Sequence, residues 1–237
     1  MTINYYNKEP LRNIEPLRSY YITAEIEIIL KYIRRYSVQQ CNLLDLGTGT
    51  GINLDFFNRK LDGDFIGIDY DSEGLKYAVS RYKGIKVIRG DASKLPFNKN
   101  TFDIVTSIGL FEMRNSFNDF IGEAVNVLKP NGILIFTAWN AEAKLNFKII
   151  DRKLNGSEGH TFNNLKDELL VRKMKIIECR TTFYTPRLLM MIFIKAIHLV
   201  HMENLIIPVI NKVNKKIFKT SYSKNNGMVW IVVARKI

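Results

Sequence analysis

Apolar and polar residues alternate along residues 42–139 in a way that is typical of strands and helices taking turns. Short apolar runs predict five buried strands, at 42–48, 64–70, 86–92, 102–110 and 133–139. Segments with apolar residues at helical spacing predict helices between them, at 52–61, 73–83 and 117–128. Strands that alternate with helices predict a parallel sheet that is covered on both faces. Right-handed crossovers make such a sheet doubly wound.

Residues with known preferences for helix ends support these segments. Ser72 and Thr161 each precede a helical pattern, and we expect their hydroxyls to cap the helices that follow. The run Lys129-Pro130-Asn131-Gly132 is expected to end the helix before it. At the other end of the chain, residues 19–36 have apolar side chains at helical spacing and should pack on the sheet.

The pattern changes after Trp139. Residues 140–160 are polar and predict mostly loop, with a short helix at 141–152. A helix at 162–173 and strands at 174–183 and 228–236 complete the predicted sheet at seven strands. Between those last two strands, residues 185–219 read as helical with a break near Pro208. No linker-like boundary interrupts the chain, so we expect a single domain with a C-terminal helical insertion.

Composition excludes several classes of protein. Hydrophobic residues make up 46% and charged residues 24% of the 237 residues, which is ordinary for a folded globular chain. The two cysteines, Cys41 and Cys179, are far apart and predict two buried thiols rather than a zinc site or a disulfide framework. No secretory signal is visible and no apolar stretch approaches ~18 residues, so we expect a cytoplasmic location.

The positive charge is concentrated near the C-terminus. The formal net charge is +12, and residues 185–237 contain nine Lys or Arg against one acid, Glu203. A basic segment favours anionic partners such as nucleic acid or a lipid surface. The alternative is a compositional bias, because the whole chain is rich in Lys, Asn and Ile.

The most informative segment is Asp45-Leu46-Gly47-Thr48-Gly49-Thr50-Gly51, which links the first strand to the first helix. Glycines there let the backbone turn tightly, and the helix N-terminus that follows favours an anion. Asp69 ends the second strand, where a carboxylate can accept hydrogen bonds from ribose hydroxyls. These features predict a site for a nucleoside cofactor.

Two common nucleotide motifs are not present in this loop. Ile52 stands where the dinucleotide fingerprint has its third glycine, which counts against NAD or FAD. No Gly-Lys-Ser/Thr follows the loop, which excludes a P-loop.

Five segments, which occur in the expected order and at the expected intervals, together resemble a known family. They are LLDLGTGTG, FIGIDYDSEGLKYA, VIRGDASKLPF, FDIVTSIGLFEM and VLKPNGILIF. Together they resemble the class I S-adenosylmethionine-dependent methyltransferases, the broad group that includes the ubiquinone and menaquinone methyltransferases. The resemblance covers about residues 42–139. It implies a Rossmann-like α/β fold, S-adenosylmethionine as the cofactor, S-adenosylhomocysteine as the product, and no metal.

The resemblance also implies a role for each residue of the cofactor site. Gly47, Gly49 and Gly51 match the loop along the methionine moiety, and Asp45 matches the acid near its amino group and sulfonium. Thr48 stands where many relatives have cysteine. The remaining matches are Asp69 for the ribose, Tyr70 over the adenine, Asp91 and Ala92 at the adenine edge, and Ser107 with Ile108 as the floor under the cofactor.

No catalytic residue is assigned. Methyl transfer from a sulfonium is a direct displacement, and a general base is needed only where the acceptor must lose a proton. Relatives often have a Glu-His pair after the fourth strand, and here Glu112 is followed by Met113. Glu112 and His160 stay open as bases, with solvated or ordinary loop residues as the alternative. His198 and His201 are three apart on a predicted helix, where packing is the simpler interpretation.

The resemblance divides the single domain, residues 1–237, into three parts. Residues 1–40 should form a helical lid, in which Tyr20 or Tyr21 could touch the cofactor, and residues 41–140 the cofactor-binding core. Residues 141–237 should form the substrate side, with a helical cap at 185–219.

The acceptor is open to several interpretations. The apolar and basic cap predicts a small or lipid-like acceptor and peripheral membrane contact, or a packed cap or dimer face. An RNA (tRNA) methyltransferase is the second hypothesis, although no RNA-binding module is visible, so nucleic acid is the less favoured partner. A non-catalytic cofactor-binding partner of another enzyme is the third. The oligomeric state stays open.

Overall fold

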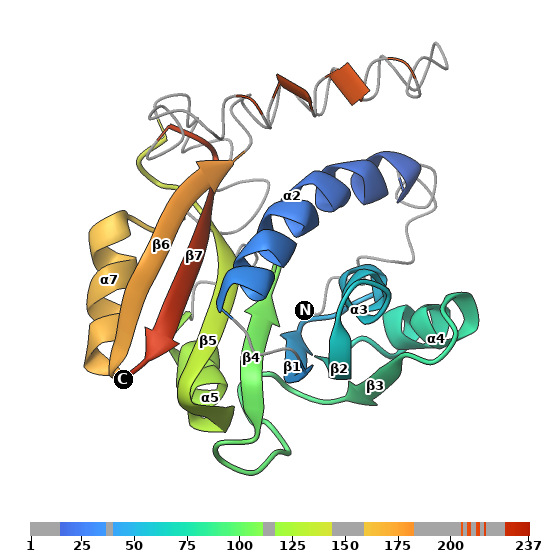
Figure 1. Ribbon diagram of the computed structural model, residues 1–237, viewed down its shortest axis with the longest axis horizontal. Helices are drawn as coiled ribbons and strands as arrows, with labels where there is room; N and C mark the ends of the chain where they lie inside the picture. The colour runs from blue at the N-terminus through green and yellow to red at the C-terminus, as the bar shows by residue number, and fades with distance from the viewer. Residues whose placement is uncertain are drawn as a thin grey trace.

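The computed structural model describes residues 15–36, 40–110, 117–143, 159–182 and 226–237, together with residues 205, 208–209, 212–213 and 216. Its centre is a seven-stranded sheet in the order β3-β2-β1-β4-β5-β7-β6 (Figure 1). The strands are β1 (Gln40–Leu46), β2 (Asp62–Asp69), β3 (Lys86–Arg89), β4 (Phe102–Ser107), β5 (Leu128–Trp139), β6 (Met174–Thr182) and β7 (Val229–Lys236).

Strand directions make the sheet mostly parallel. β1 pairs in parallel with both β2 and β4, and the β2–β3 and β4–β5 pairs are parallel too. β7 alone runs antiparallel to its neighbours β5 and β6. The predicted fold class, a doubly wound Rossmann-like α/β sheet of seven mostly parallel strands, is confirmed.

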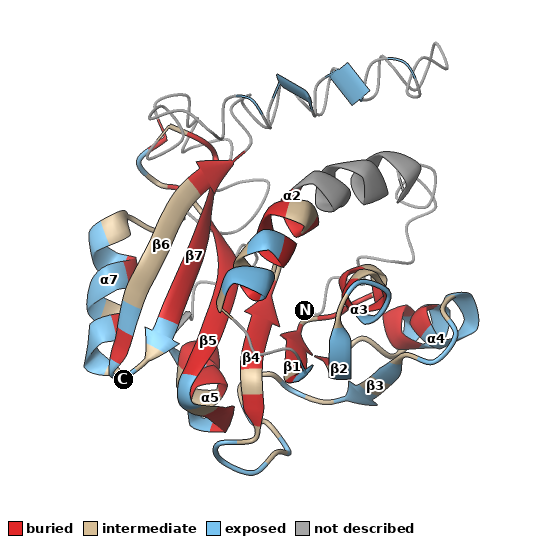
Figure 2. Cartoon of the chain, viewed as in Figure 1, coloured by how far each residue is buried: buried red, intermediate tan, exposed pale blue. Residues whose placement is uncertain are grey.

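Helices cover both faces of the sheet. The described helices are α2 (Glu15–Tyr36), α3 (Ile52–Asn58), α4 (Ser72–Arg81), α5 (Phe117–Val127) and α7 (Phe162–Val171). α2 and α3 share one buried apolar cluster with strand residues such as Leu43 and Ile135. α5 and α7 share a second cluster with residues of the opposite strand face, such as Leu44 and Phe136. Figure 2 shows the resulting buried positions along the central strands.

Successive residues of a central strand contact the two helix layers in turn, because the strand is buried on both faces of the sheet. In β7, for example, Ile231 and Val233 belong to the α2/α3 cluster, whereas Trp230, Val232 and Ala234 belong to the α5/α7 cluster.

The first residues of α4 and α7 and the region of Pro208 bear on three predictions made from the sequence. The cap of α4 is Asp71, whose carboxylate accepts the Glu73 N–H at 3.1 Å, and Ser72 is the first helical residue. Thr161 caps α7 as expected, through the Asn164 N–H. Pro208 and Val209 are helical, and residues 206–207 and 210–211 lie outside the described part of the chain, so the break near Pro208 stays a prediction.

The remaining early expectations concern thiols, membranes and the short helix at 141–152. Cys41 is buried and Cys179 is half-buried, and both thiols are free. Burial raises the pKa of Cys179 to about 12. Among the described residues, no helix is long and apolar enough to span a membrane. Most of residues 141–152 lie outside the described part of the chain, and residues 141–142 form a turn.

Candidate functional site

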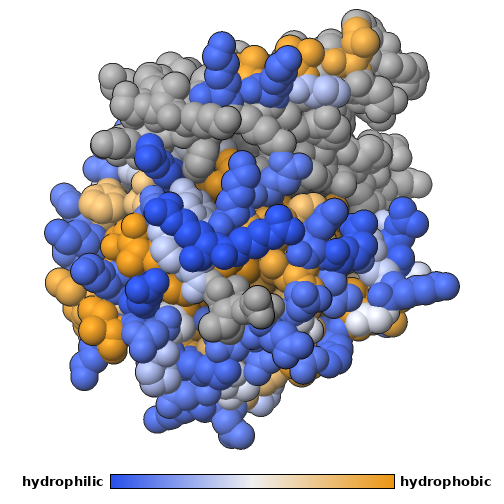
Figure 3. All heavy atoms as spheres, viewed as in Figure 1, coloured by the Kyte–Doolittle hydropathy of each residue, from blue (hydrophilic) through white to orange (hydrophobic). Residues whose placement is uncertain are grey.

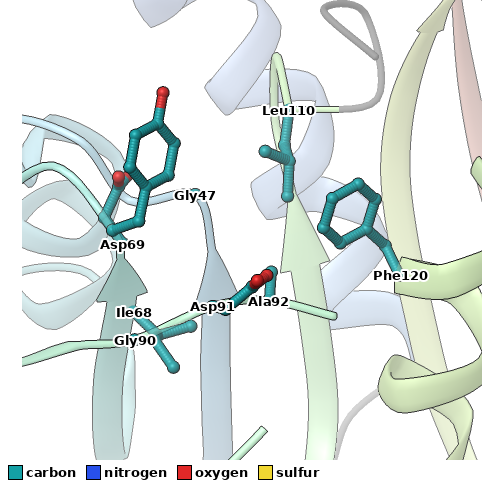
Figure 4. Close-up of a pocket in the computed structure, with 9 residues that line it drawn as sticks. Gly47, Ile68, Asp69, Gly90, Asp91, Ala92, Leu110 and Phe120 are labelled. Carbon is teal, nitrogen blue, oxygen red and sulfur yellow. The ribbon is translucent and has the colours of Figure 1, made fainter. Parts of the chain in front are cut away.

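A hollow of about 260 Å³, part of it open to solvent, lies at the carboxyl ends of the parallel strands. β1 has β2 on one side and β4 on the other, so this edge is the topological switch point where open α/β sheets bind ligands. The hollow is lined by Gly47, Ile68, Asp69, Tyr70, Gly90, Asp91, Ala92, Leu110 and Phe120. In Figure 4, Leu110 and Phe120 lie across the hollow from Asp69.

The glycine loop is held against the end of β2. The N–H groups of Gly47 and Thr48 both donate to the Ile68 carbonyl, at 2.9 and 3.1 Å. Gly47, Gly49 and Gly51 have φ values of +72°, +53° and +74°. Only glycine adopts this region readily, so the sequence of the loop follows from its shape.

Gly51 also has no room for a side chain. It is the N-cap of α3, and a Cβ there would lie 2.8 Å from the Cβ of Ala78 on α4. The glycine therefore allows α3 and α4 to pack closely beside the hollow.

Asp69 connects the loop to the next helix. Its Oδ2 accepts the Gly49 N–H at 2.8 Å, and its Oδ1 accepts the Asp71 N–H at 2.9 Å. Burial raises the pKa of Asp69, and the hydrogen bonds from these backbone amides oppose that rise. The carboxylate is thus held in a fixed position at the rim of the hollow.

Asp45 and Thr48 lie beneath the loop rather than in the hollow. Asp45 is 1% exposed, and its Oδ1 accepts the Thr106 hydroxyl at 2.8 Å. Neither Asp45 Oδ2 nor Thr48 Oγ1 has a hydrogen-bond partner within the protein. Burial raises the pKa of Asp45 to about 6, and the nearby hydroxyls of Thr106 and Thr48 oppose this rise. A positive charge or a hydrogen-bond donor close to Asp45 Oδ2 would offset the free-energy cost of burying this oxygen.

Thr48 fits against Gly67 in the middle of β2. A Cβ on Gly67 would lie 2.7 Å from the Thr48 side chain, so this glycine makes the space that the threonine occupies.

Asp91, Ala92 and Tyr70 form the more open side of the hollow. Asp91 is exposed, and its Oδ1 accepts both the N–H and the hydroxyl of Ser93, at 2.9 and 2.8 Å. Tyr70 is 47% exposed. The Gly90 N–H donates to the Asp69 carbonyl at 2.9 Å, which holds the chain after β3 beside the end of β2.

Ser107 is buried and does not line the hollow. Its hydroxyl donates to the Leu46 carbonyl at 3.4 Å, joining the ends of β4 and β1. Of the ten residues expected to bind the cofactor, the hollow brings together Gly47, Asp69, Tyr70, Asp91 and Ala92. Asp45, Thr48, Gly49, Gly51 and Ser107 lie around or beneath it.

Four residues of the hollow were not expected as site residues: Ile68, Gly90, Leu110 and Phe120. Gly90 precedes Asp91, and a Cβ there would lie 2.8 Å from Ile68, so its position beside a strand end was the available signal. Leu110 and Phe120 look like ordinary core residues in the sequence.

The candidate bases are only partly described. Glu112, Met113, His198 and His201 lie outside the described residues, as do the side chains of Tyr20 and Tyr21. No group of three or more potential metal ligands occurs in the described ranges.

His160 lies at the carboxyl end of β5, where it forms a bridge with Asn140. Its carbonyl accepts the Trp230 indole N–H at 3.0 Å, and its own N–H donates to the Trp139 carbonyl at 2.7 Å. Burial lowers the pKa of the imidazole. His160 does not line the hollow.

Strand order and glycine loop together define the class I S-adenosylmethionine-dependent methyltransferase fold. Residues 44–136 match the family described as "Methyltransferase domain". These residues therefore carry a methyltransferase domain, in agreement with the resemblance found in the sequence.

Individual relatives agree with this assignment. Phthiotriol/phenolphthiotriol dimycocerosates methyltransferase 1 of Mycobacterium ulcerans is 32% identical over 98 residues, which are 40% of this chain and 36% of the relative. Fatty-acid O-methyltransferase of Mycolicibacterium smegmatis is 26% identical over 131 residues, which are 54% of this chain and 46% of the relative. The matched stretch thus spans less than half of either relative.

A solved structure shows the same fold over most of the chain. The S-adenosylmethionine-dependent methyltransferase of Aquifex aeolicus is similar with a TM-score of 0.56 and 17% identity. The similarity covers 87% of this chain and 88% of that one.

Proposed function

We propose that this protein transfers a methyl group from S-adenosylmethionine to a small or lipid-like acceptor by direct displacement. The observation that carries the proposal is the meeting of Gly47, Asp69 and Asp91 around one hollow. These residues follow or end three adjacent strands at the switch point, and the class of the chain implies this cofactor.

The residues of the hollow suit the parts of this cofactor. Asp69, fixed by two backbone amides, would accept the ribose hydroxyls. Asp91 and Ala92 would meet the adenine edge, and Tyr70 would cover the ring. Gly47, Gly49 and Gly51 would lie along the methionine end, where their lack of a side chain leaves the backbone accessible.

The buried acid fits the charge of the methionine end. Asp45 Oδ2 has no donor in the protein, and a cationic amino group or sulfonium near it would compensate the cost of its burial. Thr48 and Ser107 would support this contact from beneath the loop.

When bound, the sulfonium supplies a methyl group that is already activated for transfer. The chain's contribution is to orient the acceptor and to keep water out, and good orientation is worth roughly 7–11 kcal/mol in favourable cases. The apolar side chains of Leu110 and Phe120 serve this purpose on the wall opposite Asp69. No residue is assigned as a base.

Two relatives support the choice of acceptor, because their names refer to phthiotriol lipids and to fatty acids. We also propose the division into a helical lid at 1–40, a cofactor core at 41–140 and a substrate side at 141–237. The proposed location is the cytoplasm, with peripheral contact to a membrane.

Calorimetric titration with S-adenosylmethionine and S-adenosylhomocysteine tests the cofactor, with NADH as the control ligand. We expect micromolar binding of the first two and none of NADH. Asp69→Ala and Asp91→Ala should each weaken binding by tenfold or more, since a hydrogen bond to a charged group is worth about 1.5–3 kcal/mol. Asp64→Ala changes an exposed carboxylate on β2 outside the hollow and should bind like wild type. Near-native affinity in both site variants would remove the assignment.

The acceptor is tested with the radiolabelled methyl donor and either a lipid extract or total RNA. Label in the lipid fraction supports the proposal, whereas label confined to RNA overturns the acceptor class and keeps the cofactor. Cofactor binding without transfer to any fraction would favour a non-catalytic partner instead.

A further inference from the structure

The described residues between 205 and 216 form one exposed helical face. Leu205, Val209 and Val213 are 69%, 60% and 50% exposed. Their spacing of four residues places them on one ridge of a helix. At a rise of 1.5 Å per residue, this ridge is about 12 Å long. Large apolar side chains gathered in this way are unfavourable in water and mark a surface that is covered by a partner.

Basic residues follow the adjacent ridge of the same face. Lys212 and Lys216 are also four apart, in line with Pro208, and all three are exposed and helical. Figure 3 shows apolar and hydrophilic side chains next to one another along the top of the molecule, where this segment lies in Figure 1.

The charge of this region favours one kind of partner. No Asp or Glu occurs in the sequence after Glu203, whereas Lys212, Lys215, Lys216 and Lys219 fall within one short stretch. An apolar ridge beside lysines suits the boundary between acyl chains and anionic headgroups. Lysine stems can lie along the apolar region while their ammonium groups reach the phosphates.

We propose that this face, defined by Leu205, Val209, Val213, Lys212 and Lys216, docks on an anionic lipid surface. The apolar ridge enters the acyl boundary and the lysines bind headgroup phosphates. The inference rests on the peripheral membrane contact of the proposed function and names the surface that makes it, and docking itself requires neither the cofactor nor methyl transfer. Figure 1 shows the segment on the side toward which β4 points, and the residues that line the hollow lie at the carboxyl ends of the parallel strands. Docking there would bring the hollow toward the membrane that holds a lipid-like acceptor.

Co-sedimentation of the full chain with vesicles tests this inference. The vesicles are phosphatidylcholine alone or phosphatidylcholine mixed with phosphatidylglycerol. We expect binding to the mixed vesicles that weakens with salt, and weaker binding to the neutral ones. Lys212→Glu/Lys216→Glu should weaken binding to mixed vesicles about 30-fold or more, from roughly 1 kcal/mol per basic residue. Val209→Ser/Val213→Ser should weaken binding to both.

Matched controls carry the same changes elsewhere. Leu170→Ser/Val171→Ser alters two residues of α7 that are 60% and 80% exposed, and Lys94→Glu/Lys99→Glu reverses two exposed lysines. Both controls should bind vesicles like wild type. Equal binding by every variant, or no vesicle binding at low salt, would overturn the inference. So would a dimer in sedimentation velocity that Val209→Ser/Val213→Ser dissociates. Titration of each variant with S-adenosylmethionine reports separately on the cofactor site.

Discussion

Asp45 shows how one buried side chain couples the site to pH. Its pKa is about 6 in the folded chain against an ordinary 3.8, because burial disfavours the charged form. The folded state therefore binds a proton more tightly than the unfolded state does. The stability that this group contributes is fully present below pH ~3.8 and is lost as the pH rises through 6, by about 3 kcal/mol in total.

Asp45→Asn removes this dependence, since the amide keeps an oxygen for the Thr106 hydroxyl and carries no charge. We expect the variant to gain roughly 3 kcal/mol in unfolding free energy relative to wild type between pH 4 and pH 7. Urea unfolding at several pH values measures the difference. Asp64→Asn, on the exposed part of β2, is the control. A difference between Asp45→Asn and wild type that stays constant over this range would contradict the argument.

Element ends illustrate what the sequence could and could not predict. Both Ser72 and Asp71 are good helix caps, so composition alone could not choose between them. The structure favours Asp71 because the Asp69 carboxylate accepts its N–H, which fixes that residue one position before the helix. This contact joins a strand end to a helix start and has no local signature.

β5 differs from its prediction for a similar reason. The apolar run predicted a strand from residue 133, and the strand begins at Leu128, which pairs with Phe102 before the register shifts. Lys129 to Gly132 follow the helix as expected, but strand pairing across the sheet extends the element.

The sequence could predict the site residues at the strand ends, because glycines and carboxylates are distinctive there. It could not predict Leu110 and Phe120, since apolar residues look alike whether they face a core or a ligand.

The end of α5 depends on one residue from β7. Lys236 Nζ donates to the carbonyls of Val125 and Leu128, at 2.7 and 2.6 Å, and to Asn100 Oδ1 at 3.1 Å. An ammonium group at a helix C-terminus satisfies carbonyls that the helix leaves open and suits its dipole. Burial lowers the pKa of this lysine, with the Lys99 charge as a smaller cause.

Lys236→Met should lower the unfolding free energy by about 2 kcal/mol, because the aliphatic stem stays and the carbonyls lose a charged donor. Chemical denaturation measures the change. Lys175→Met, at an exposed position on neighbouring β6, is the matched control and should change stability by less than about 0.5 kcal/mol. Equal losses in the two variants would argue against the capping role.

At the scale of the whole molecule, β7 joins the two outer parts of the sheet. It pairs with β5 from Trp139↔Val229 to Ile133↔Arg235, and with β6 along its whole length. Val229 to Ala234 are all buried, and they contribute to both apolar clusters. β6 and α7 are therefore attached to the cofactor core largely through this strand.

Removal of residues 229–237 should abolish a single cooperative unfolding transition, because β6 loses its partner strand and β5 loses one of its two partners. Far-ultraviolet circular dichroism on heating measures this. Removal of Ile237 alone, a residue that is 73% exposed, is the control and should leave the transition within a few degrees of wild type. A sharp transition in the longer truncation would show that the core folds without β7.

The place of β7 also sets an order of events during synthesis. Ribosomes make the chain from the N-terminus, so β5 and β6 both leave the tunnel before the strand that separates them exists. Until residues 229–236 emerge, each has an unpaired edge, and such edges are prone to pair wrongly or aggregate. A nascent chain that has not yet reached residues 229–236 therefore cannot close its sheet, and we expect it to benefit from chaperone protection during that interval.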